Sequence, residues 1–384
     1  MPLVLMVLLA CYALFTLIAG NTVSERGLYQ AEKFVKITIF ILILVRCVRT
    51  PAHFHLAICA WLAGVTYISY QAWGQVGVWR SGRLDFGLGG PDFAESSDLS
   101  AHLVATLPMI GAMFFMSRRW SGRAITLLIG ALAINTLIMT RTRNAIVGLV
   151  AMGLATAMAL PRGYRAKGLA ALVVGVALAA QLADPGWWRR MSTLAEYRSD
   201  PAVMDRFHYW AAAVDMVGDN LFGIGIGNFQ ERVRAYIPHL SEARSAHNTY
   251  LECLAELGIP GFTILLTLIG VVLWRLMCIK STASRLTPMI ELGDGWWSAR
   301  FHLGWHAMGL GVGLIGYLAC GLFTTRLWAE DFWTLIGLAC CLTNVTATMD
   351  SAREDAGAAL NSQSVSAFAA LDEPSAMPET GASP

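Results

Sequence analysis

Four polar side chains that could carry chemistry lie at the start of one long apolar segment, and they are His247, Asn248, Glu252 and Glu256. On a helix that starts near His247, the other three fall at i, i+4 and i+8, on one face. A neutral imidazole there suits general-base chemistry near pH 7. Polar groups are costly at membrane depth, so the cluster indicates a functional site.

Each of these side chains also has a structural interpretation. His247 alone can be an interfacial histidine that hydrogen-bonds a carbonyl group, and the two glutamates can pair with arginines to hold helices together. Glu256 lies deepest and fits that structural role best. We therefore predict His247 as the catalytic residue, with Asn248, Glu252 and Glu256 as positioning residues.

The composition indicates a membrane protein. Of 384 residues, 56% are hydrophobic and 14% are charged, whereas soluble domains carry about 25% charged residues. The cysteines show no metal-ligand spacing, so we predict no metal site, and the net charge of +2 gives no indication of nucleic acid. The fold class predicted is an all-α polytopic membrane protein with about ten transmembrane helices in the bilayer. The predicted spans are 2–20, 34–48, 54–70, 100–116, 124–140, 144–160, 168–183, 247–279, 303–324 and 331–348.

The chain divides into a transmembrane domain, 1–349, and a tail, 350–384. The tail is rich in Ala, Ser, Pro, Glu and Asp, a composition that predicts disorder. Basic residues in the short loops near 118–123 and 162–167 place those loops in the cytoplasm. Alternation then puts the tail in the cytoplasm and the long polar loop, 184–246, on the outer side of the membrane.

Three arginines on the predicted outer side suggest an anion site. Arg141 and Arg143 lie in a short turn without an acidic neighbour. They either snorkel to the outer headgroups or bind an anion, and we favour the anion because unpaired basic residues at membrane depth mark ligand paths. Arg206 and Tyr209 belong to a helical pattern at 203–217, whose apolar face of Phe207, Trp210, Ala211, Val214 and Val217 suits a helix on the membrane surface.

Glycines punctuate the chain on both sides of His247. Gly223, Gly225 and Gly227 alternate with other residues, which predicts a tight turn whose backbone approaches another segment closely. After Glu256, the sequence Gly-Ile-Pro-Gly at 258–261 predicts a break between the polar helix start and a fully apolar helix.

Together these residue types suggest transfer at a lipid diphosphate. Guanidinium groups hold phosphate oxygens bidentately and keep their charge, so they would stabilise a departing lipid diphosphate. A histidine would take the proton of an incoming hydroxyl group.

The motifs resemble those of the bacterial O-antigen ligase and polymerase superfamily over about residues 100–280. The resemblance is carried by the arginine turn 141–144, by 205–210, by 219–229 and by 247–261. Stretches at 25–36, 89–93 and 187–194 are similar to the O-glycosylation ligases associated with exosortase A. The resemblance implies a GT-C-like fold in the bacterial inner membrane, a periplasmic active site and an undecaprenyl-diphosphate-linked glycan as donor, with no metal or ATP. It also implies that Arg141 or Arg143, together with Arg206, grips the diphosphate, and that His247 lies near the acceptor.

Three functions compete. A ligase would move a finished glycan to a hydroxyl acceptor on lipid A core, a protein or another glycan, whereas a polymerase would extend a growing chain with the same residues. A small-anion transporter should have paired broken helices in corresponding halves. The sequence has one clear break, at 258–261, which favours the glycosyltransferases.

Overall fold

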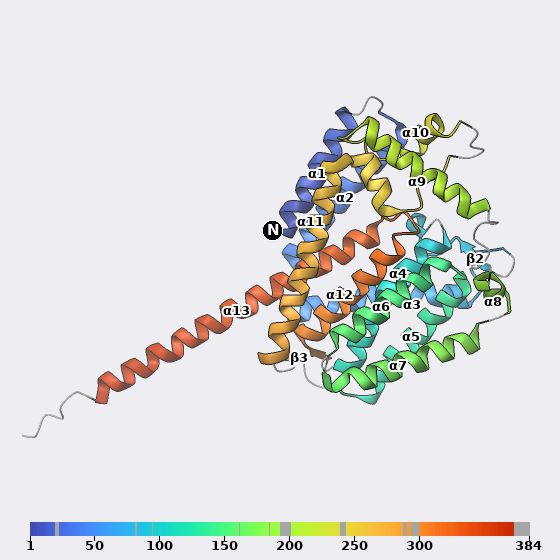
Figure 1. Ribbon diagram of the computed structural model, residues 1–384. Coiled ribbons are helices and arrows are strands. Elements are labelled where there is room, and N and C mark those ends of the chain that lie inside the picture. The colour runs from blue at the N-terminus through green and yellow to red at the C-terminus, as the bar shows by residue number, and fades with distance from the viewer. Residues whose placement is uncertain are drawn as a thin grey trace, which may run out of the picture.

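The protein is an all-α polytopic membrane protein built as a bundle of long helices (Figure 1). The computed structural model describes residues 1–19, 23–80, 83–93, 95–160, 162–183, 185–192, 201–238, 243–286, 290–292 and 299–371. Each of the ten predicted spans corresponds to one helix of the bundle. These helices are α1 (Pro2–Ala19), α2 (Glu25–Cys47), α3 (Pro51–Trp73), α4 (Ser96–Met116), α5 (Trp120–Thr140), α6 (Arg143–Ala159), α7 (Arg162–Leu182), α11 (Thr249–Leu286), α12 (Leu303–Cys320) and α13 (Glu330–Leu371).

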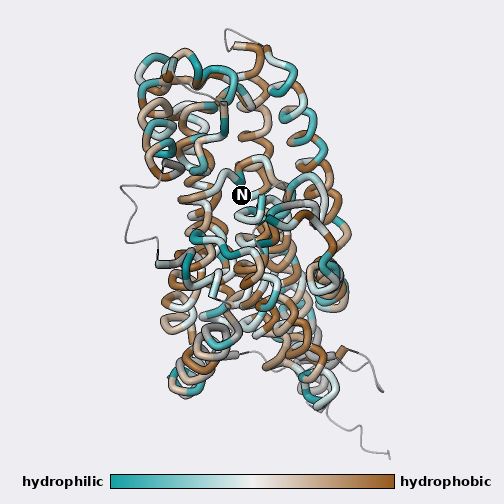
Figure 2. Tube along the Cα trace, turned by 90° about the vertical axis from the view of Figure 1, so that its right-hand side faces the viewer, coloured by the Kyte–Doolittle hydropathy of each residue, from teal (hydrophilic) through white to brown (hydrophobic). Residues whose placement is uncertain are grey.

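Among the described residues, seven of these helices are long and apolar enough to cross a membrane. α6 is apolar but only 17 residues long. α2 begins nine residues before its predicted span, because Ser24 caps it by accepting a hydrogen bond from the backbone N–H of Gly27. Figure 2 shows that hydrophobic residues predominate along the bundle helices, as expected for helices that face lipid.

Short elements cover one end of the bundle. They are the antiparallel hairpin of β1 (Val78–Arg80) and β2 (Arg83–Phe86), the 3-10 turn η1 (Pro91–Phe93), and the helices α8 (Pro185–Ser192), α9 (Pro201–Asp219) and α10 (Phe229–Tyr236). A second hairpin joins β3 (Ile290–Leu292) to β4 (Ala299–Phe301) between α11 and α12.

The last helix is longer than its predicted span. α13 continues to Leu371, and its second half leaves the bundle (Figure 1). The structure therefore has helix over much of the segment whose composition predicted disorder, and residues 372–384 of that segment lie outside the described residues.

The predicted break in the polar helix is confirmed. Gly258 has φ 63° and ψ −170°, outside the helical region, in the middle of α11. The glycine loop meets α11 there, since the backbone N–H groups of Ile224 and Gly225 donate to the carbonyls of Ala255 and Glu256, each at 3.0 Å. Gly223, Gly225 and Gly227 all have positive φ, so the predicted close approach of this loop is confirmed as well.

The close contact between the glycine loop and α11 predicts that Gly258→Ala disrupts the fold. A Cβ at Gly258 would lie 2.3 Å from the Leu221 carbonyl oxygen, and the positive φ adds backbone strain on the order of 1–3 kcal/mol. We expect a lower yield of monodisperse protein in detergent and a lower thermal unfolding midpoint. Gly270→Ala in the same helix is the matched control, because a Cβ there meets no heavy atom within 4 Å. Equal midpoints for the two variants would contradict the prediction.

α9 has two apolar faces. The face that packs against α11 and its neighbours carries Tyr209, Ala212, Ala213 and Met216. Phe207 and Val214, from the predicted apolar face, are instead exposed, at 46% and 57%. This exposed face is compatible with the expectation that α9 lies on the membrane surface. The face that carries Tyr209 packs against the rest of the protein.

Candidate active site

His247 lies immediately before the cap of α11. Its φ is 48°, in the left-handed region, and the helix begins at Thr249. The Asn248 Oδ1 accepts hydrogen bonds from the backbone N–H groups of Tyr250 (3.0 Å) and Leu251 (3.1 Å). The helix thus starts two residues after His247, because Asn248 supplies the acceptor that the free N–H groups of the first turn need.

Charged side chains from three segments surround the His247 imidazole. Its Nδ1 lies 4.0 Å from Glu95 Oε2, directly before α4, and only 12% of the histidine side chain is exposed. Burial lowers the pKa of His247, Glu95 opposes that effect, and the positive charges of Arg206 in α9 and Arg244 add to it. The net direction is downward, so the imidazole is neutral at pH 7 and can accept a proton.

The two arginines of the turn, Arg141 and Arg143, lie between α5 and α6. Arg141 ends α5 in the left-handed conformation, with φ 47°. Its guanidinium group lies against α8, so closely that a Cβ on Gly186 would be 2.6 Å from Nη1. Arg143 begins α6 and is half-buried.

Asn144 connects this turn to the start of α4. Its Nδ2 donates to the Ser97 carbonyl (3.0 Å), and its Oδ1 accepts from the Ser100 hydroxyl (3.1 Å). The start of α4 also holds Glu95 beside His247. The structure thus links the arginine turn to the histidine through one helix terminus.

The two glutamates of α11 make structural contacts. Glu252 is 6% exposed, and its Oε2 accepts hydrogen bonds from the Ala246 N–H and the Thr325 hydroxyl, each at 2.8 Å. Because Ala246 directly precedes His247, Glu252 fixes the backbone that carries the imidazole. This contact fits the positioning role predicted for Glu252.

Glu256 joins the break in α11 to two other segments. It is 1% exposed. Its Oε1 accepts from the Phe229 N–H (3.2 Å), and its Oε2 accepts from the Trp328 indole (2.8 Å). Both oxygens are therefore occupied by protein donors, which fits a structural role, but these donors are a backbone N–H and an indole rather than the arginines that the structural interpretation expected. Tyr209, also predicted to position the site, is 3% exposed in the packed face of α9.

A buried ionic network lies beneath the site and centres on Arg326, between α12 and α13. Its Nη2 donates to Asp331 Oδ1 (2.6 Å), its Nε donates to the Tyr317 hydroxyl (3.1 Å), and its Nη1 lies 3.5 Å from Asp98 Oδ1. His102 Nδ1 lies 3.4 Å from the second oxygen of Asp331. The Arg326 side chain is 3% exposed.

Sequence reasoning did not select Glu95, Arg244 or Arg326. An arginine between two apolar runs, with an acidic residue five positions later, was a usable signal for Arg326, because ionisable residues near membrane depth are rare without a partner. Glu95 had a weaker signal, as the acidic residue directly before a span. Nothing in the spacing of Arg244 indicated its approach to His247.

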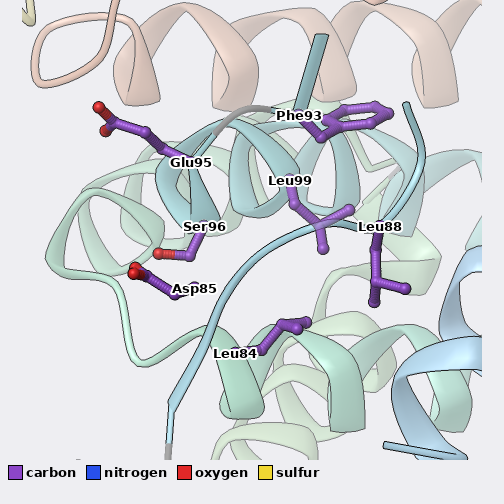
Figure 3. A pocket seen from close by; sticks show the side chains of 7 residues that line it. All are labelled: Leu84, Asp85, Leu88, Phe93, Glu95, Ser96 and Leu99. Atoms are coloured by element: carbon purple, nitrogen blue, oxygen red, sulfur yellow. The ribbon is translucent and has the colours of Figure 1, made fainter. Parts of the chain in front are cut away.

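A small pocket, with a cavity volume of about 10 Å³, adjoins the Glu95 side of the site. Figure 3 shows its lining, with Phe93, Leu88 and Leu99 grouped together and the polar ends of Glu95 and Ser96 on the other side. The pocket lies between the first hairpin and the start of α4. The remaining lining residues are Leu84 and Asp85.

The fold and the site define a polytopic membrane protein. At one end of its helical bundle, under the connecting segments, lie a partly buried histidine and several arginines. Residues 127–266 match the family model described as O-antigen ligase, and this match supports the resemblance to the O-antigen ligase and polymerase superfamily, whose members are membrane enzymes that transfer glycans. The matched region contains both arginines of the turn, Arg206 and the start of α11. No curated protein matches the chain.

Proposed function

We propose that the protein transfers a glycan from an undecaprenyl-diphosphate carrier to a hydroxyl acceptor on the periplasmic side of the bacterial inner membrane. The single observation that carries this proposal is the placement of a partly buried His247, whose pKa is lowered by burial and by Arg206 and Arg244, within a region that matches O-antigen ligases. A base next to cations is the pairing that attack by a hydroxyl group on a diphosphate-linked sugar needs.

The reaction forms a bond between the acceptor oxygen and the anomeric carbon of the donor glycan. The bond from that carbon to the diphosphate oxygen breaks, and the electron pair leaves with undecaprenyl diphosphate. The acceptor proton passes to the His247 imidazole. Arg206, with Arg141 or Arg143, stabilises the negative charge that develops on the leaving diphosphate. These steps need no metal ion or ATP, because the leaving group is already activated.

A product analysis tests this proposal. Wild-type protein in proteoliposomes is given an undecaprenyl-diphosphate-linked glycan and candidate hydroxyl acceptors. The proposal expects glycan on the acceptor and free undecaprenyl diphosphate in equal amounts. Longer lipid-linked chains without acceptor product would instead indicate a polymerase, and anion flux without transfer would indicate a transporter.

The diphosphate role of Arg206 gives a separate prediction. Arg206→Ala should lower transfer by roughly 100-fold, because one charge-stabilising donor is lost from the transition state. Arg206→Lys should restore only part of the rate, since an ammonium group cannot bind a phosphate bidentately. Initial rates over a range of donor concentrations measure both effects.

Arg234→Ala is the matched control for Arg206, because Arg234 is an exposed arginine in the neighbouring helix α10. It should transfer at the wild-type rate. Wild-type transfer by Arg206→Ala would exclude this residue from the diphosphate site.

A further inference from the structure

A carboxylate outside the matched region faces the catalytic histidine. Glu95 precedes α4, and its Oε2 is 4.0 Å from Nδ1 of His247. The histidine side chain is 12% exposed, while that of Glu95 is 53% exposed. The carboxylate therefore approaches from the open side of the site, toward one particular nitrogen of the ring.

Glu95 is held by the first turn of α4. Its backbone N–H donates to Asp98 Oδ2 (3.2 Å), and its Oε2 accepts from the Ser97 hydroxyl (3.1 Å). Asp98 is buried, and its Oδ1 accepts from the Thr324 hydroxyl at 2.8 Å. The exposed Glu95 carboxylate is thus held by a buried helix start, and this reduces the conformational freedom that surface carboxylates normally keep.

The same short segment between α12 and α13 also holds the start of α11. The Thr249 N–H donates to the Gly321 carbonyl (2.8 Å), and the Thr249 hydroxyl donates to the Thr324 carbonyl (2.8 Å). The Arg326 N–H donates to that hydroxyl (3.0 Å). Because residues 321–326 bind both helix starts, they fix the distance between Glu95 and His247.

Glu95 is the negative group among the charges that act on this imidazole, and Arg206 and Arg244 are the positive ones. A carboxylate that faces Nδ1 favours, by electrostatics, the neutral tautomer with its proton on Nδ1. The lone pair is then on Nε2, which is available to the acceptor hydroxyl. The carboxylate also offsets the positive charge that the ring gains when it takes the proton.

We propose that Glu95 is a positioning residue for the transfer reaction, which fixes the orientation and the Nδ1–H tautomer of His247 so that Nε2 acts as the base. The inference rests on the proposed function for its kinetic consequence. Its structural content, the tautomer, stands independently of any substrate. In the transfer step, the acceptor proton moves to Nε2 while the Nδ1 proton stays between the ring and Glu95.

The first experiment observes the tautomer without substrate. Full-length protein carrying ¹⁵N-labelled histidine is compared with Glu95→Ala and Glu95→Gln by NMR, and the His247 signals are identified from their loss in His247→Ala. We expect the Nδ1–H tautomer in the wild type at pH 7 and a mixture of tautomers in Glu95→Ala. In Glu95→Gln, the imidazole should titrate at lower pH, because the opposing negative charge is gone while Arg206 and Arg244 remain. An unchanged tautomer and titration in both variants would overturn the proposal.

The second experiment measures transfer against pH in proteoliposomes with an undecaprenyl-diphosphate-linked glycan. Glu95→Gln should lower kcat by roughly 10-fold or more with little change in the donor KM, and should move the acid limb to lower pH. Glu95→Asp keeps the charge and should restore the acid limb. Glu32→Gln is the matched control, because Glu32 is an exposed carboxylate paired with Lys36, and it should leave the profile unchanged.

The two experiments separate the two proposals. Suppose that Glu95→Ala loses the tautomer preference while His247→Ala transfers glycan at the wild-type rate. The interaction between Glu95 and His247 would then be supported, and the role of His247 as the base would be overturned. Loss of transfer in His247→Ala with a wild-type pH profile and kcat in Glu95→Gln would keep the base and overturn the role of Glu95.

Discussion

Arg326→Met should destabilise the protein by about 3–5 kcal/mol, because it removes the cation from a buried network and leaves its carboxylates uncompensated. Asp331 and Asp98 are 6% and 8% exposed, and both face the Arg326 guanidinium group. Methionine fills similar volume, so the loss reflects charge more than packing. Reversible unfolding in mixed detergent micelles, followed by tryptophan fluorescence, measures the change in free energy.

Removing the whole network should cost much less than breaking it. In Arg326→Met combined with Asp98→Asn and Asp331→Asn, the guanidinium group and both carboxylates of the network are removed, and we expect most of the lost stability to return. Arg49→Ala, at an exposed arginine, should unfold like the wild type. If the single and triple variants lost the same free energy, the network would be stabilising through its shape rather than its charge.

The Arg326 network also shows what the sequence could not reveal. Its members come from α4, from α12 and α13 and from the segment between them, and Asp98 and Arg326 lie 228 positions apart. Hydropathy locates such helices individually, but it does not say which termini meet. The pairing of Glu95 with His247 depends on the same packing, so neither contact was accessible from periodicity.

Local features could be predicted from the sequence because they depend on the backbone conformations that particular residue types allow. The break at Gly258 and the close approach of the glycine loop follow from residues that tolerate positive φ. For α9, sequence reasoning selected one apolar face and did not select the face that packs against the bundle. Its sequence has apolar residues on two faces, and the larger side chains of Phe207 and Val214 drew the prediction to one of them. The packed face is instead built around Tyr209 and two alanines, because small residues let α9 approach its neighbours closely.

Replacement of His247 by alanine should have the largest effect on catalysis. We expect transfer to fall by roughly 10²–10⁴-fold, the usual contribution of a positioned general base. The donor KM should change little, because the proposed diphosphate ligands are arginines. His53→Ala is the matched control, since His53 is an exposed histidine in the first turn of α3 whose Nδ1 contacts the Cys47 carbonyl. Initial rates of acceptor glycosylation in proteoliposomes measure both variants.

The pH dependence of wild-type transfer gives the same base an independent signature. Only the neutral imidazole accepts a proton, so the rate should fall as pH drops through the pKa of His247. Burial, with Arg206 and Arg244 adding to it, lowers that pKa from 6.5. The acid limb should therefore have its midpoint below pH 6.5, and it should be missing from the residual activity of His247→Ala. A midpoint above 6.5 would mean that the carboxylate of Glu95 outweighs burial and both arginines, and an acid limb that persists in His247→Ala would assign the titration to another group.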